Sequence, residues 1–123
     1  MTWSDFHTKS EKLASEAEAA LKDGELVEAR RLYADAAKAE VEALKRLDKT
    51  KQRTLGIITV SAVALWYKAK QFAQAEQIAY QVLSEGSLPE FAVIQVKELL
   101  QTIWNEVERQ RADVKCKRTI YLS

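Results

Sequence analysis

The sequence predicts an all-α protein of antiparallel helical hairpins, and three observations lead to this fold class. Only three glycines and one proline occur in 123 residues, so few positions interrupt a helix. Alanine, glutamate, lysine, leucine and glutamine, which favour helices, dominate the composition. Apolar residues recur at steps of three and four along most of the chain. We therefore expect five helices in one domain at residues 1–112, followed by a C-terminal tail at residues 113–123.

The first two expected helices form a hairpin. The first spans about residues 3–22 and carries its apolar residues on one face. Gly24 follows it and suits the left-handed conformation that often ends a helix. The second helix spans about residues 26–48, and the cations near its end complement the helix dipole.

Three more helices are expected after this hairpin. The third, about residues 53–69, is apolar on nearly every side, which is typical of a central helix. Its β-branched residues could also form a strand, but no second strand is predicted to pair with it. The fourth spans about residues 72–84. The fifth spans about residues 88–111 and begins at Ser87–Glu90, where the serine and the glutamate can form a capping box.

The tail differs from the rest of the chain. Residues Lys115–Ser123 show no helical pattern and contain the apolar residues Ile120, Tyr121 and Leu122. We expect this segment to be extended or disordered. It could add a strand to a partner's sheet or dock in a groove.

One local pattern occurs twice, with a spacing of 46 from Ala29 to Ala75. In each copy a bulky apolar residue, Leu26 or Phe72, stands three positions before the alanine. An aliphatic residue stands three positions after it. A small residue at this place allows two helices to cross closely, so the pattern predicts two similar hairpins.

This helix–turn–helix unit resembles the tetratricopeptide repeat over about residues 10–89. The matching residues are Leu13, Ala17, Leu21, Gly24, Leu26, Ala29, Tyr33 and Ala36, then Val63, Trp66, Tyr67, Phe72, Ala75, Ile78, Val82 and Pro89. The spacing of 46 departs from the family's roughly 34 residues, and the extra length falls in residues 44–54. The first hairpin is also similar to the MIT domain (microtubule interacting and trafficking), a three-helix module. The resemblance implies a right-handed array whose open end the fifth helix caps.

The resemblance to tetratricopeptide repeats also implies a non-enzymatic adaptor, scaffold or assembly factor. Such folds bind a segment of another protein in the groove lined by the first helix of each hairpin. Carried over to this chain, the candidate partner-binding residues are Leu21, Lys22, Ile57, Val60, Ala64, Tyr67 and Lys68. This apolar floor suits an amphipathic helix or an apolar strand better than an acidic peptide, with Lys22 and Lys68 orienting the partner.

The large aromatic residues and the single histidine are the other candidates. Trp66 and Trp104 lie in apolar stripes and are expected in the core, whereas Trp3 is expected to be exposed. His7 could act as a base or a metal ligand only with partners. Nothing in the spacing favours the imaginable ones, Asp5, Glu11 and Cys116.

Composition and motifs narrow the function classes. Nineteen basic side chains stand against 18 acidic ones, which lacks the basic excess of a dedicated nucleic-acid binder. Two basic clusters, Lys45–Arg53 and Lys115–Arg118, nevertheless keep a regulatory nucleic-acid-binding protein as an alternative. No phosphate loop, nucleophile elbow or metal-ligand set occurs, so no catalytic residue, cofactor or metal is expected.

Further observations bear on compartment and assembly. One cysteine fits a reducing cytoplasm. The N-terminus lacks a signal-peptide pattern, and the most apolar run, Leu55–Tyr67, is shorter than the roughly 20 residues of a membrane span. Two repeats are fewer than the three that usually make such an array stable. A self-assembling oligomer is therefore a second alternative.

Overall fold

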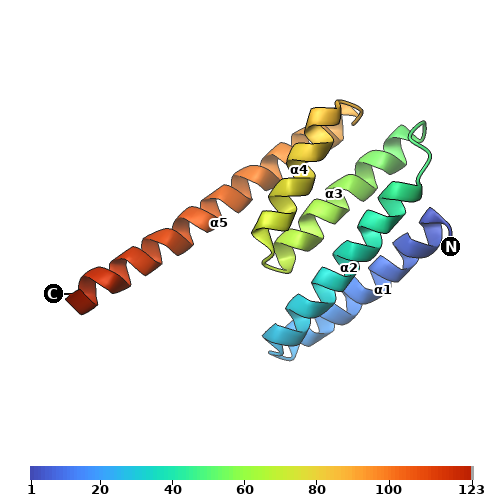
Figure 1. The fold of residues 1–123 in the computed structure, drawn as a ribbon. Coiled ribbons are helices and arrows are strands. Elements are labelled where there is room, and N and C mark those ends of the chain that lie inside the picture. The colour runs from blue at the N-terminus through green and yellow to red at the C-terminus, as the bar shows by residue number, and fades with distance from the viewer. Residues whose placement is uncertain (123) are drawn as a thin grey trace.

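The computed structural model describes the backbone of residues 1–122 and the side chains of residues 1–116. Five helices make up the fold (Figure 1), and no strand occurs among the described residues. Their bounds are Trp3–Lys22 (α1), Leu26–Arg46 (α2), Gln52–Lys68 (α3), Phe72–Glu85 (α4) and Glu90–Leu122 (α5). The all-α class with five helices is thus confirmed.

The helices pack in the order of the sequence, with antiparallel neighbours. The main contacts join α1 to α2, α2 to α3, and α3 to α4, while α5 lies against both α3 and α4. Figure 1 shows α3 between the α1–α2 hairpin and the α4–α5 pair. The prediction that the most apolar helix is central is therefore confirmed.

The turns of the two hairpins have the same backbone structure. Every turn hydrogen bond of the first recurs 46 residues later in the second. The matched N–H to C=O pairs are Asp23 to Ala19 with Ala69 to Leu65, Gly24 to Leu21 with Lys70 to Tyr67, and Glu25 to Ala20 with Gln71 to Trp66. The left-handed position is held by Gly24 in the first turn (φ 78°) and by Lys70 in the second (φ 63°). The doubled sequence pattern therefore corresponds to a doubled turn.

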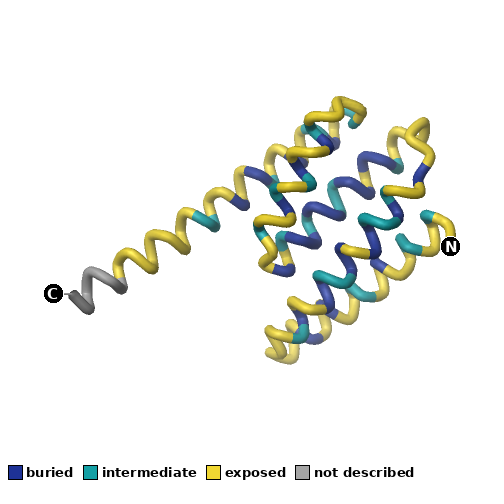
Figure 2. Tube along the Cα trace, viewed as in Figure 1, coloured by how far each residue is buried: buried dark blue, intermediate teal, exposed yellow. Residues whose placement is uncertain are grey.

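Small residues dominate the core where the helices cross. Ala29 and Ala75, which define the repeated pattern, are both buried, as are Ala17 and Val63 on the preceding helices. Figure 2 shows the buried positions concentrated on α2 and α3. The expected close packing at these alanines is thus observed.

The fifth helix differs from its predicted bounds at both ends. It begins at Glu90 rather than 88, because the C=O of Pro89 accepts the N–H of Ala92 and of Val93. It runs on to Leu122, so the expected break near residue 111 and the non-helical tail are wrong. No glycine or proline follows Pro89 to stop the helix, and β-branched residues cost a helix only about 0.5 kcal/mol each.

The second half of α5 leaves the bundle. In Figure 1 it projects as a single helix away from the other four. All side chains from Glu108 to Cys116 are exposed (Figure 2). The side chains of Ile120, Tyr121 and Leu122, predicted as a docking element, lie outside the described residues. The division into a domain at 1–112 and a segment at 113–123 stays a prediction.

Candidate functional site

A pocket of about 250 Å³ lies where the two hairpin turns meet α2. We call it the turn pocket. Its lining comes from the end of α1, the start of α2, the end of α3 and the second turn. The lining residues are Leu21, Leu26, Ala29, Arg30, Tyr33, Tyr67, Lys68 and Lys70. Both hairpins contribute because their turns lie at the same end of the molecule (Figure 1).

Two tyrosines form the inner wall of the turn pocket. Tyr33 is buried, and this burial, together with the negative charge of Glu18, raises the pKa of its hydroxyl. Tyr67 is half-buried, and its ring centroid lies 5.7 Å from that of Phe72. Aromatic rings at such distances hold each other in place. The wall is therefore apolar and fixed by packing.

Three cations stand at the rim. The Nζ of Lys68 lies 5.9 Å from the centre of the Tyr33 ring, and the Nζ of Lys70 lies 5.6 Å from that of Tyr67. Ammonium groups at these distances are attracted to ring faces. Arg30 lines the same pocket from α2. None of the lining residues is acidic.

Acidic groups also lie near the rim. Glu106 on α5 binds Arg109, with 2.5 Å from Oε1 to Nη2. That hydrogen bond from Arg109 lowers the pKa of Glu106, and the charge of Lys70 lowers it further. Glu18 acts on Tyr33 from α1. The lining of the turn pocket itself thus carries three cations and no carboxylate.

The predicted binding residues fall into two groups in the structure. Leu21, Tyr67 and Lys68 meet in the turn pocket. Four others do not line it: Lys22, Ile57, Val60 and Ala64. Ile57 and Lys22 are exposed, and the other two are half-buried on α3.

Sequence reasoning missed five of the eight lining residues: Leu26, Ala29, Arg30, Tyr33 and Lys70. The turn residues and the small alanine were given structural roles only. The available signal was the repeat itself, because matching turns in two hairpins lie at the same end.

The tryptophans were predicted with mixed success. Trp66 is buried in the core, as expected. Trp104 is 41% exposed, so its assignment to the core is wrong. Its ring lies 6.5 Å from that of Tyr80, and its Nε1 donates to the Tyr80 hydroxyl at 3.2 Å. The α4 partner thus holds it at the surface. Trp3, expected to be exposed, is half-buried.

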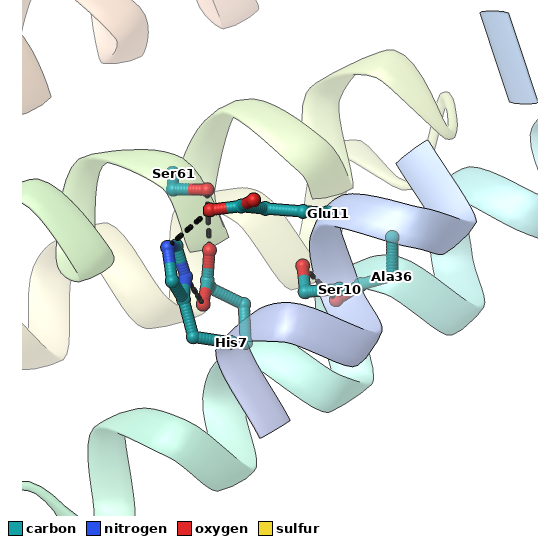
Figure 3. A network of polar contacts seen from close by, with 6 residues as sticks. His7, Ser10, Glu11, Ala36 and Ser61 are labelled. Atoms are coloured by element: carbon teal, nitrogen blue, oxygen red, sulfur yellow. Dashed lines mark hydrogen bonds and ion pairs between the residues drawn. The ribbon is translucent and has the colours of Figure 1, made fainter. Parts of the chain in front are cut away.

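A second polar cluster joins α1, α2 and α3 (Figure 3). His7 Nδ1 lies 2.8 Å from Oε1 of Glu40, and His7 Nε2 lies 2.6 Å from Oε1 of Glu11. The hydroxyl of Ser61 donates to Oε2 of Glu40 at 2.7 Å. Of the partners imagined for His7, Glu11 is therefore present, and the buried Glu40 was missed.

The geometry of this cluster favours a structural role. The Ser61 hydroxyl bonds to the carboxylate of Glu40 and not to the imidazole, so the Ser–His contact of an activated nucleophile is not formed here. Both ring nitrogens of His7 face carboxylate oxygens, an arrangement that an imidazolium satisfies with two donors. Within residues 1–116, no group of three His, Cys, Asp or Glu side chains is arranged to hold a metal ion.

The basic segment Lys45–Arg53, which begins in the last turn of α2, is largely engaged within the protein. Lys45 and Arg46 both pair with Glu42, and Lys49 Nζ donates to the carbonyl of Leu44 at 3.0 Å. Asp48 adds a negative charge between them. Nucleic-acid binding through this segment stays a prediction.

The described part of the chain contains no helix with the length and hydrophobicity that crossing a membrane requires. In comparisons with known proteins, no family model, curated protein or solved structure matches the chain.

Proposed function

We propose that this chain is a non-enzymatic, tetratricopeptide-like interaction module that docks a segment of another protein in the turn pocket. The turn pocket itself carries the proposal, because it is an apolar hollow with exposed walls. Leu21 is 49% exposed there, and concave apolar sites with a few polar groups are the usual binding sites.

The repeat-like character rests on the two matching turns. They share their hydrogen bonds at a spacing of 46, and each is followed by a buried alanine, Ala29 or Ala75. α5 lies against the second hairpin, the place of a capping helix. Arrays of this kind serve mainly as scaffolds, and we place this one in the cytoplasm, where a lone exposed thiol such as Cys116 stays reduced.

A partner helix or strand can continue from the turn pocket along α3. Ile57, Val60 and Ala64 precede Tyr67 at steps of three and four, so they share its side of the helix. Ile57 is exposed and the other two are half-buried. They extend the apolar contact, while the turn pocket receives the largest side chain.

Affinity capture with matched variants tests this function. The full chain serves as bait in lysate of its host, beside Leu21→Asp, which places a charge on the pocket wall. Val27→Asp is the control, because Val27 is 84% exposed and does not line the pocket. A protein retained by the wild type and by Val27→Asp, but lost with Leu21→Asp, would support docking in the turn pocket. Equal retention by all three would overturn it.

Self-association is the second candidate function, and the projecting half of α5 favours it. A helical segment of this length is marginal on its own in water, and a second copy could cover it. Light scattering on the full chain would then give twice 14.0 kDa, and a chain ending at Ala112 would give a monomer. A full chain that is monomeric at all concentrations would contradict this candidate.

A further inference from the structure

We propose that the turn pocket recognises an acidic segment with a bulky apolar side chain. This inference rests on the proposed docking function and specifies its partner. The apolar side chain enters between Leu21, Leu26 and the two tyrosines, and carboxylates beside it meet Arg30, Lys68 and Lys70.

The size and lining of the turn pocket set the apolar half of the ligand. About 250 Å³ is below the range of about 300–1,000 Å³ for whole small-molecule sites. It suits one or two side chains. Leu21 and Leu26 are about half exposed, so a side chain placed between them and Tyr33 removes apolar surface from water on both partners.

The rim sets the charged half. Arg30 comes from α2, Lys68 from the end of α3 and Lys70 from the second turn, so three cations approach from different directions. Glu18 and Glu106 are two carboxylates near this site, and Glu106 already binds Arg109. Carboxylates on a ligand would complete the charge balance with charge-assisted hydrogen bonds.

Lys70 supplies an independent observation. The first turn places Gly24 at the left-handed position, and the second turn places a lysine there with the same hydrogen bonds. A residue with a side chain pays a strain cost in this conformation that glycine does not pay. Glycine at this position would avoid the strain but would place no ammonium group at the pocket rim. The presence of Lys70 there supports a binding role for its charge.

From the sequence, an amphipathic helix or an apolar strand suits the groove better than an acidic peptide, because its floor is expected to be apolar with only Lys22 and Lys68 at the edge. In the structure Lys22 does not line the turn pocket, while Arg30 and Lys70 do. The cationic side of the site is therefore larger than the sequence indicated.

Nuclear magnetic resonance titration of the full ¹⁵N-labelled chain tests this inference. The probe is a short synthetic peptide with leucine and tryptophan flanked by aspartates and glutamates. In the control peptide, asparagine replaces each aspartate and glutamine replaces each glutamate, while the leucine and the tryptophan stay. We expect the acidic peptide to bind about tenfold more tightly and to shift the amide signals of Leu21, Tyr67 and Lys70. We also expect its affinity to fall with added salt.

Two variants place the charge effect at the rim. Lys70→Gly keeps the turn, because glycine adopts the same backbone conformation, and should weaken the acidic peptide about threefold to tenfold. Lys22→Gln removes a nearby cation that does not line the turn pocket, and should leave the affinity unchanged. Equal losses in both variants would indicate a long-range charge effect and overturn the assignment to the rim.

The remaining outcomes separate this inference from the docking function. If the amide peptide binds the same residues equally well, the acidic specificity is wrong and the docking function stands. If neither peptide binds while Leu21→Asp still loses a partner in the capture experiment, the acidic specificity is again wrong and the docking function again stands. If both experiments are negative, both proposals fail. If a single-stranded oligonucleotide shifts the same signals at lower concentration, the rim serves phosphates and the peptide inference is overturned.

Discussion

The imidazole of His7 on α1 lies 2.8 Å from the carboxylate of Glu40 on α2, whose side chain is only 1% exposed. The same carboxylate accepts the hydroxyl of Ser61 on α3. A carboxylate removed from water must be paired and hydrogen-bonded to be tolerated. Glu40 therefore fixes how three helices sit beside one another, well away from the turn pocket.

Breaking this pair should destabilise the fold. We expect His7→Ala and Glu40→Ala each to lower the free energy of unfolding by about 1–3 kcal/mol. The first leaves the buried Glu40 without its imidazole partner, and the second leaves both His7 and Ser61 without the carboxylate. The double variant should lose less than the sum, with a coupling of about 1 kcal/mol or more. Urea unfolding measures all three, and Glu11→Gln, at the exposed end of the cluster, should change stability by less than about 1 kcal/mol. Additive effects would mean that the pair does not act as a unit.

The two matching turns allow a reciprocal exchange. Lys70→Gly should raise the free energy of unfolding by about 0.5–1 kcal/mol, because it relieves the left-handed backbone (φ 63°). Gly24→Lys should lower it by about 1 kcal/mol. A Cβ at Gly24 would meet nothing within 4 Å, so any loss there reports the backbone alone. Thermal unfolding measures both variants. If Lys70→Gly and Gly24→Lys changed the free energy of unfolding in the same direction, the backbone strain at Lys70 would be refuted.

Gly56 is the point where α3 approaches the start of α5. A Cβ there would lie 2.6 Å from Cζ of Phe91, 2.9 Å from Cγ of Pro89 and 3.0 Å from Cβ of Ala92. Gly56→Ala should therefore cost about 1–3 kcal/mol through overpacking, although alanine is the better helix former. The ring end of Phe91 can move, but the proline and the helix behind it cannot. Adding Phe91→Ala should recover only part of the loss, and full recovery in chemical unfolding would contradict this account.

The N-terminus of α1 should give a defined acid response. Thr2 and Asp5 form a capping box, and the Thr2 backbone N–H, then the Thr2 hydroxyl, lower the pKa of the Asp5 carboxyl below its ordinary value of 3.8. A lowered pKa means that the folded chain binds this proton less readily than the unfolded chain. Its contribution to stability is therefore complete above pH 3.8 and is lost as the pH falls through the lower folded value.

The measurement is the unfolding midpoint across this acid range. Asp5→Asn should show a smaller decrease between neutral and acidic pH than the wild type. Glu16→Gln, at an exposed position of the same helix, serves as the matched change of charge. An Asp5→Asn chain with the same acid slope as the wild type would exclude the capping box as the source.

Sequence periodicity predicted the helices because most of them bury one apolar face and end at recognisable residues. Gly24 takes the left-handed conformation after α1, as expected. The sequence predicts too early an end for α5, because the pattern of apolar residues fades where the helix leaves the bundle. The backbone hydrogen bonds of a helix form without a core, so the helix continues beyond that point. A periodic spacing of apolar residues indicates that one face of a helix is buried. A helix that packs against no neighbour therefore lacks this pattern in its sequence.

The sites were harder to predict, for two physical reasons. Glu40 lies between Ala39 and Val41 on a charged helix, and its partner His7 is 33 residues away, so no local spacing indicates a buried pair. Lys70 stands in a turn, where cations are ordinarily solvated. Its place on a pocket rim depends on how the two hairpins sit together, which the spacing of 46 suggests but does not determine.

The succession of helix contacts also bears on how the chain acquires its structure. Each main contact joins helices that are neighbours in sequence or next but one, and short loops connect them. The relative contact order is therefore low, and little loop-closure entropy is lost before each contact forms. Chains of this topology fold in about microseconds to milliseconds. The first hairpin can thus form while the second is still being synthesised, and α3 then adds to a surface that already exists.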